Sequence, residues 1–206
     1  DIQENLRKIC TPDLMKHIEV VHLDQWVNRY LRAHEYPYTI VYGEQIDDMW
    51  KKAESFTGED FYLPEGFFQE EWETVVQAQN IQTLAEYAKA PRPGRGIRLD
   101  RKLRMRVWKV FEGYRTMMDA EKVCDAACAM NECAQLLTAG PEVRLYAAVI
   151  VDEGQDFGPS AYRLLRAIAG SEHTNDLFIV GDAHQRIYKN KVILSRCGIN
   201  VKGRSS

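Results

Sequence analysis

The stretch "YAAVIVDEGQDFGPS", residues 146–160, decides the fold class of this chain. Its first six residues are apolar, Asp152 and Glu153 then stand side by side, and Asp156 follows three residues later. A short apolar run that ends in polar residues and glycine is typical of a buried strand. Carboxylates at the end of such a strand are costly unless a positive partner compensates their charge. The stretch therefore predicts a strand with a charged group or ligand at its end.

The residues around this stretch predict a parallel sheet. We expect a strand over 145–151, a helix that has Pro159 in its first turn and Gly170 past its end, and a second apolar strand over 177–182. Fully apolar strands joined through a helix indicate parallel strands that are covered on both faces.

The rest of the chain separates into two kinds of sequence. Residues 18–21 are mostly β-branched and predict a short strand. A helix with one apolar face (Trp26, Val27, Tyr30 and Leu31) follows it. From about 42 to 139 the apolar residues follow helical spacing, with helices expected over 70–79, 83–90 and 100–118 and with Asp100 as the cap of the third. We therefore expect an α/β fold in which 1–41 and 143–206 belong to one domain and 42–142 form a mainly helical insertion.

Composition narrows the class of protein. With 206 residues, 45% hydrophobic and 28% charged, the chain is expected to fold around one good core. It has no apolar run near the roughly 18 residues that a membrane helix needs, so no membrane partner is expected. No signal-peptide core is present and the five cysteines suit a reducing compartment, which predicts a cytoplasmic protein. The chain does not begin with Met, so we expect it to be a piece of a longer protein.

A local cluster of positive charge could bind nucleic acid. The net charge of −3 gives no general attraction to DNA, but eight basic residues lie between Arg92 and Lys109, with Asp100 as the one acid among them. Such a stripe suits phosphate contacts, for which Arg95, Arg98 and Arg101 are the candidates. The alternative is a solvated helix face that the acidic stretch 59–73 offsets.

Both predicted strands end in acidic residues. In open α/β sheets the ligand lies beyond the carboxyl ends of the strands, where Asp152, Glu153 and Asp182 are expected. Mg²⁺ binds one or two carboxylates and completes its coordination with water and phosphate oxygens. A second carboxylate beside the metal ligand can orient or deprotonate a water molecule. The alternative is an ordinary strand end whose carboxylates cap the next loop.

Two motifs together resemble those of a known family. "VIVDEGQDF", followed by "VGDAHQRIY", resembles motifs II and III of superfamily 1 DNA helicases of the UvrD/Rep type, whose patterns are DExQD and GDxxQxIY. The matching residues are Asp152, Glu153, Gln155 and Asp156 in the first motif, and Gly181, Asp182, Gln185, Ile187 and Tyr188 in the second. This resemblance implies a partial RecA-like parallel sheet of the P-loop NTPase class with a helical insertion subdomain.

The resemblance also implies residue roles. Asp152 would hold the Mg²⁺ of bound ATP, and Glu153 would act as the catalytic general base. Asp182 and Gln185 would bind the nucleotide, Gln155 and Asp156 would couple the two loops, and Tyr188 would lie near single-stranded DNA.

Two regions match the family pattern less well. In "IEVVHLDQW" (18–26), His22 and Asp24 stand where a DNA-contacting Thr-x-His motif would be expected. We expect either that His22 or Trp26 contacts DNA, or that this segment is a packed corner between a strand and a helix. After Tyr188, the family has an aromatic Trp-Arg-Gly stretch, whereas this chain has Lys189, Asn190 and Lys191. Any DNA contact at that point would be electrostatic.

The 206 residues contain no phosphate-binding loop of the form GxxxxGK[ST]. The resemblance implies that the parent protein is an ATP-dependent DNA helicase or translocase that works on single-stranded DNA, with DNA repair among its expected processes. Because the loop is absent, we expect this chain alone to be inactive. The alternatives are a helicase fused to a nuclease, or a non-catalytic scaffold or interaction module of the same fold.

Overall fold

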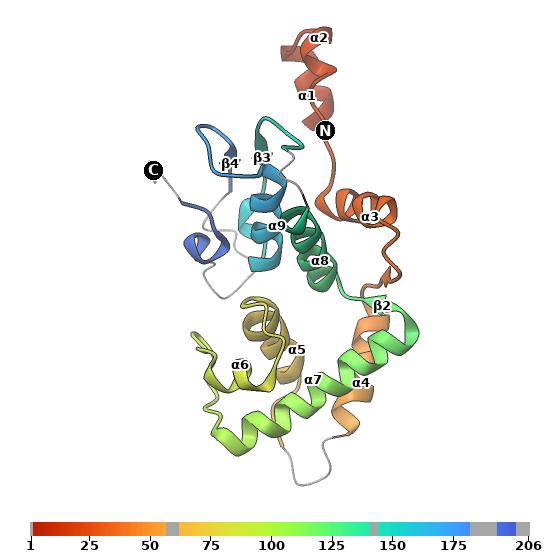
Figure 1. Cartoon of the computed structure of the whole chain (residues 1–206), viewed down its shortest axis with the longest axis vertical. Coiled ribbons are helices and arrows are strands. Elements are labelled where there is room, and N and C mark those ends of the chain that lie inside the picture. The colour runs from red at the N-terminus through yellow and green to blue at the C-terminus, as the bar shows by residue number, and fades with distance from the viewer. Residues whose placement is uncertain (1, 57–61, 141–143, 182–192, 201–206) are drawn as a thin grey trace. The chain divides into compact units, whose positions relative to one another are not determined.

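The computed structural model of the chain describes residues 2–56, 62–140, 144–181 and 193–200 (Figure 1). The chain divides into two compact units, Asp1–Tyr36 and Pro37–Ser206. Each has its own secondary structure.

The first unit contains three helices: α1 (Ile2–Ile9), α2 (Pro12–Met15) and α3 (Leu23–Ala33). The apolar face expected for α3 is confirmed, because Trp26, Val27 and Leu31 are buried. The strand expected over 18–21 is wrong, since these residues have irregular backbone. β-branched residues favour a strand only where a neighbouring strand pairs with them, and the described residues of this unit include no strand.

The second unit begins with a helical region. The prediction of α7 is confirmed in detail, because Asp100 caps it by accepting a hydrogen bond of 2.8 Å from the Leu103 amide. The segment expected as one helix over 70–79 is instead a short α-helix followed by a turn of π-helix. The elements of this region are α4 (Glu44–Ser55), α5 (Phe67–Glu71), the π-helix η1 (Trp72–Gln77), α6 (Leu84–Lys89) and α7 (Arg101–Glu121).

Aromatic side chains form the core of this helical region. Trp50 stacks on Tyr114 with ring centroids 3.9 Å apart, and Phe111 lies edge-on to Trp50 and Trp108. Aromatic pairs in these arrangements add about 0.5–1.5 kcal/mol each to the free energy gained by burial. The core therefore joins α4, η1, α6 and α7 around one cluster.

Two short parallel sheets lie in the same unit. The strands β1 (Thr39–Ile40) and β2 (Val123–Cys124) flank the helical region and pair with each other. After α8 (Ala126–Ala139), strand β3 (Val149–Val151) pairs in parallel with β4 (Leu177–Ile179). Helix α9 (Pro159–Ala169) connects β3 to β4 and packs along α8 (Figure 1).

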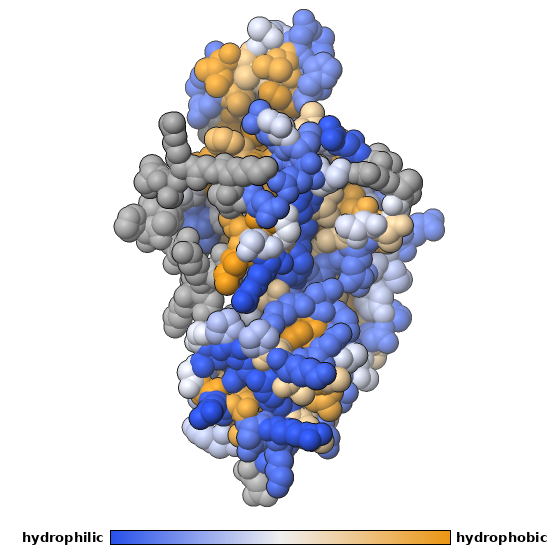
Figure 2. Space-filling model, turned by 60° about the vertical axis from the view of Figure 1, so that its left-hand side comes forward, coloured by the Kyte–Doolittle hydropathy of each residue, from blue (hydrophilic) through white to orange (hydrophobic). Residues whose placement is uncertain are grey.

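The expected strand–helix–strand order and the parallel pairing are confirmed, but two details were wrong. Both strands are shorter than their apolar runs, because regular pairing covers three residues of each. One face of the β3–β4 pair is also open: Ile150 is 76% exposed and its register partner Phe178 is 67% exposed. On the face of the molecule drawn in Figure 2, apolar areas lie between hydrophilic ones.

None of the helices in the described part of the chain combines the length and the apolar character that a membrane crossing needs.

Candidate functional site

The carboxylate-bearing loop starts where β3 ends. Asp152 and Glu153 follow Val151 directly, and a single 3-10 turn, η2 (Gly154–Asp156), leads on toward α9. Asp152 Oδ1 accepts a hydrogen bond of 3.0 Å from the Glu153 amide. Gln155 Nε2 donates one of 2.5 Å to Glu153 Oε2. Both carboxylates are exposed and are oriented by their own loop.

The backbone of Glu153 is held in an unfavourable conformation. Its φ of 52° and ψ of 38° lie in the left-handed region, which costs a residue with a side chain about 1–2 kcal/mol. The turn persists because neighbouring bonds fix it: the Gly154 amide donates to Val180 O at 2.8 Å, and the Asp156 amide donates to Glu153 O at 3.0 Å. Strain of this kind is concentrated at functional sites.

Two glycines let this loop lie against the end of the β4 segment. A Cβ atom on Gly154 would be 2.6 Å from Ile179 Cγ2 and 3.2 Å from Val180 O. A Cβ atom on Gly181 would be 2.9 Å from the backbone nitrogen of Gln155. Any side chain at either position would push the two segments apart. The structure thus brings the first sequence motif into contact with the start of the second.

The two carboxylates suit a hard divalent cation. Among the residues that the structure describes, neither Asp152 nor Glu153 forms an ion pair with an arginine or a lysine. Mg²⁺ needs one or two carboxylates from the protein and takes the rest of its ligands from water or phosphate. The donor set therefore fits Mg²⁺ bound with a phosphate-containing ligand. No cluster of three or more His, Cys, Asp or Glu side chains suited to a metal occurs in the described ranges.

Other candidate residues fall in different places. Asp182, Gln185 and Tyr188 lie outside the described residues. His22 is exposed and stands at the N-cap of α3 without a side-chain capping bond. Asp156 is half-buried at the end of η2.

Of the basic residues between Arg92 and Lys109, some are exposed and others are enclosed in the fold. Arg98 and Arg101 are exposed, as are Lys102 and Lys109. Arg95 is enclosed instead, with a side chain that is 5% exposed and ion-paired with Glu70 and Glu71. This placement does not support the expected phosphate contact of Arg95, because its guanidinium group is already occupied inside the fold.

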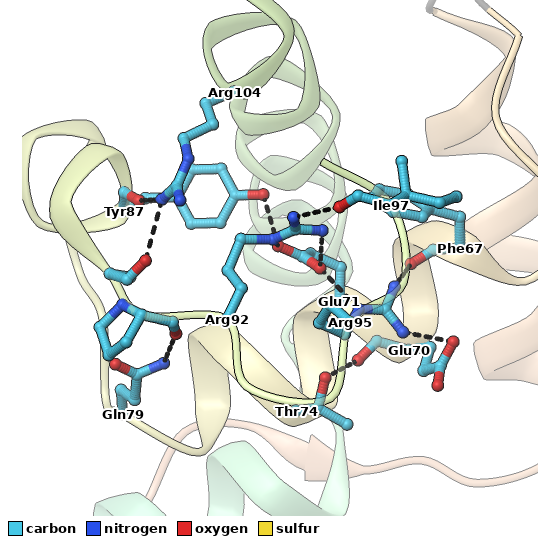
Figure 3. A network of polar contacts seen from close by, with 12 residues as sticks. Phe67, Glu70, Glu71, Thr74, Gln79, Tyr87, Arg92, Arg95, Ile97 and Arg104 are labelled. Carbon is cyan, nitrogen blue, oxygen red and sulfur yellow. Dashed lines mark hydrogen bonds and ion pairs between the residues drawn. The ribbon is translucent and has the colours of Figure 1, made fainter. Parts of the chain in front are cut away.

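Glu71 is the centre of the network that encloses Arg95 (Figure 3). Its fully buried carboxylate accepts bonds of 2.5 and 2.8 Å from Arg92 and one of 2.8 Å from Arg95 Nε. The hydroxyl of Tyr87 adds a further bond of 2.8 Å. Burial alone would raise the pKa of Glu71, but the bonds from Arg92, Tyr87 and Arg95 hold this pKa below its usual value.

The network fixes the loop 90–99, which carries the exposed Arg98 and leads into α7. Arg92 Nη1 also donates to Ile97 O at 2.5 Å, and Arg95 Nη2 donates to Phe67 O at 3.2 Å. The guanidinium of Arg95 lies over the Phe67 ring at 5.0 Å. The loop 90–99 is thereby attached to α5. The sequence showed Glu71 only as part of an acidic stretch, and nothing local connects it with partners 21 and 24 residues away.

These features define a class of protein: an α/β fold with a helical region, in which a strand-end carboxylate loop contacts the end of the neighbouring parallel strand. Residues 1–191 match the family model of the UvrD/REP helicase N-terminal domain. The chain belongs to this family, as its two motifs indicated. A comparison with curated proteins gives no match.

Proposed function

We propose that the chain is part of the motor of an ATP-dependent DNA helicase or translocase, with a RecA-like domain built from 1–41 and 143–206 and a helical insertion at 42–142. The observation that carries this proposal is the exposed pair Asp152 and Glu153 at the end of β3, in a chain of the UvrD/REP helicase family. ATP and single-stranded DNA would be its ligands.

The chemistry would use the two carboxylates differently. Asp152 would hold the Mg²⁺ of ATP, which supplies positive charge for the phosphate oxygens. Glu153 would accept a proton from the attacking water, and its bond with Gln155 keeps one carboxylate oxygen in place. Because Asp152 bonds to the Glu153 amide, the metal ligand and the base share one rigid turn.

The remaining roles follow the family resemblance. Asp182 and Gln185 would contact the nucleotide, Gln155 and Asp156 would couple the two loops, and Tyr188 would contact the DNA. The contact of Gly181 with the Gln155 backbone supports the coupling role, because a shift of one loop must move the other. For DNA we propose His22 and the exposed Arg98 and Arg101.

The magnesium proposal can be tested with Mn²⁺, whose free form is measured by electron paramagnetic resonance. In the parent protein, which would supply the phosphate-binding loop, we expect Mn²⁺ to bind together with a non-hydrolysable ATP analogue, and Asp152→Asn to weaken this binding about tenfold or more. The matched control is Asp48→Asn, on the exposed surface of α4. Equal binding by both variants would contradict the assignment of Asp152.

ATP turnover separates this proposal from its alternatives. Because the 206 residues contain no GxxxxGK[ST] loop, the chain alone should not hydrolyse ATP, with or without DNA. DNA-stimulated turnover by this chain would contradict that expectation. A parent protein without turnover would favour a non-catalytic scaffold, and one that also cleaves DNA would favour a helicase–nuclease.

A further inference from the structure

Helix α9 contacts the carboxylate loop through Tyr162. The buried Tyr162 hydroxyl donates a hydrogen bond of 2.5 Å to Gly154 O, in the turn that follows Glu153. The Phe157 ring lies edge-on to the Tyr162 ring, with centroids 6.3 Å apart. A Cβ atom on Gly154 would be 3.1 Å from this hydroxyl, so the turn and the helix are in close contact. A movement of the turn would therefore displace α9 as well.

The next residue of the same helix contacts the helical region. Arg163 Nη1 donates to Ala78 O at 2.6 Å, and Arg163 Nη2 donates to Gln77 O at 2.5 Å. These carbonyl groups lie at the C-terminal end of η1, where a helix has a partial negative charge, and Gln77 O also accepts a bond of 3.2 Å from the Asn80 amide. Arg163 thus caps the π-helix from another part of the chain, about 85 residues away in sequence.

Further contacts make this cap specific. Arg163 Nη2 also lies 2.8 Å from Asn131 Oδ1 on α8. The buried Asn131 amide in turn donates to Gln77 Oε1 at 2.7 Å. The guanidinium fork therefore joins α9, α8 and η1 at one point. A lysine has a single charged nitrogen and cannot reproduce this arrangement.

The other end of the π-helix leads to the network of Glu71. Glu71 immediately precedes Trp72, the first residue of η1, and its carboxylate binds Arg92 and Arg95 of the loop 90–99 (Figure 3). The single turn η1 is therefore fixed at its end by Arg163 and at its start by this loop. π-helical turns are uncommon and often occur at functional sites, because they contain one residue more than an α-helical turn.

We propose that Tyr162 and Arg163 are positioning residues that couple the carboxylate loop to η1, so that the geometry of Glu153 depends on the helical region. The contacts form one continuous path from Gly154 through α9 and η1 to the loop 90–99, which carries the exposed Arg98. This inference deepens the proposed function and rests on it for its role in catalysis. The mechanical coupling itself needs neither metal, nucleotide nor DNA.

Amide hydrogen exchange measured by nuclear magnetic resonance tests the coupling in both directions. Arg163→Met removes the contact with η1, and we expect faster exchange at the distant amides of Gly154, Asp156 and Phe157. Tyr162→Phe removes the contact with the carboxylate loop, and we expect faster exchange at Ala78 and Ile81. Each increase should be about two- to tenfold, the range that corresponds to the loss of one buried hydrogen bond.

Controls separate coupling from loss of stability. Arg166→Met removes an arginine from the same helix, but its partners are Asp176 and Gly170, so exchange at the carboxylate loop should not change. Core amides of α7 in each sample report global unfolding. Arg163→Lys should give an intermediate effect, since one carbonyl bond can be restored.

Faster exchange only beside each substituted residue would overturn the proposal and leave Arg163 as a simple helix cap. An effect at the carboxylate loop from Arg166→Met as large as that from Arg163→Met would overturn it too. The exchange experiment uses neither metal nor nucleotide. A negative result would therefore contradict the coupling alone, whereas a negative Mn²⁺ test would contradict the proposed metal site.

Discussion

Gly154 is the residue on which the shape of the carboxylate loop depends. We predict that Gly154→Ala destabilises the fold by about 1–3 kcal/mol, as expected for overpacking. The added methyl would lie 2.6 Å from Ile179 Cγ2 and 3.2 Å from Val180 O, and the backbone oxygen cannot rotate away. Urea denaturation measures the loss in free energy of unfolding.

Gly158→Ala is the matched control for this substitution. Gly158 stands at the N-cap of α9 with a φ of −84°, and a Cβ atom there would meet nothing within 4 Å. Its cost should stay below about 1 kcal/mol. Equal losses in the two variants would show that the close approach of Gly154 to β4 does not limit stability.

Arg98 and Arg101 are the residues through which DNA binding is best tested. Their double alanine variant should bind a single-stranded oligonucleotide more weakly, and the slope of log affinity against log salt should fall by about 1.4, since each phosphate contact contributes about 0.7. Lys51→Ala with Lys52→Ala is the control, because both lysines are exposed on α4. Fluorescence anisotropy at several salt concentrations measures both values.

Unchanged affinity in the arginine variant, or an equal loss in the lysine variant, would remove these arginines from the DNA surface. Arg95 would be a poor choice for this test. Its substitution would break buried ion pairs and so confound binding with stability.

Local patterns predicted several individual residues correctly. Asp100 caps α7, Pro159 begins α9 and Gly170 follows that helix, as their positions in the sequence indicated. These roles depend on neighbours within a few residues. The partners of Glu71 and Arg163 could not be predicted, because they come from elements 16 to 86 residues away.

At the scale of elements, the network of Glu71 attaches the loop 90–99 to α5. We predict that Glu71→Gln destabilises the fold by about 3–5 kcal/mol at pH 7, because Arg92 would keep a buried charge without a counter-charge and Arg95 would keep only the exposed Glu70 as its partner. Glu70→Gln is the control. Glu70 also pairs with Arg95, but its side chain is 54% exposed, so its loss should cost less than about 1 kcal/mol.

The contribution of Glu71 should depend on pH in a defined direction. Its pKa is lower in the folded state than its ordinary value of 4.5, so its stabilising effect is complete above that pH and is lost as the pH falls below it. The difference in unfolding free energy between the wild-type chain and Glu71→Gln should therefore shrink on acidification. A difference that stays constant from pH 7 to well below 4.5 would contradict the charged state of Glu71.

In two elements the pattern of apolar residues does not predict the secondary structure correctly. Residues 72–77 have apolar positions that suit an α-helix, yet they form a π-helix whose ends are held by distant arginines. The apolar run 145–151 forms regular pairing only from Val149, since a strand extends only as far as its partner. In both cases tertiary contacts override a local preference.

At the scale of the whole molecule, sequence reasoning predicted the mixed α/β class and the parallel pairing of the last two strands. It did not predict that one sheet face is open. The sequence of an apolar strand does not show whether its faces are covered, because the elements that would cover them lie elsewhere in the chain. The domain boundaries at 41 and 142, and the roles of Asp182, Gln185 and Tyr188, stay predictions.

The open face predicts how the molecule behaves at high concentration. Ile150 and Phe178 are neighbours in the β3–β4 register and both are mostly exposed, so they form an apolar pair at the surface. Strand edges without a partner, and apolar side chains exposed on a sheet face, promote association between molecules. Phe178→Thr should reduce concentration-dependent association in sedimentation velocity, and it should keep the strand because Thr also favours β structure.

Tyr62→Thr is the control for this substitution, because Tyr62 is 94% exposed but lies outside any strand. It removes an aromatic ring from the surface without changing the sheet. If both variants reduced association equally, surface hydrophobicity in general would be the cause. If only Phe178→Thr does so, the open face of β3 and β4 is the surface through which the molecules associate.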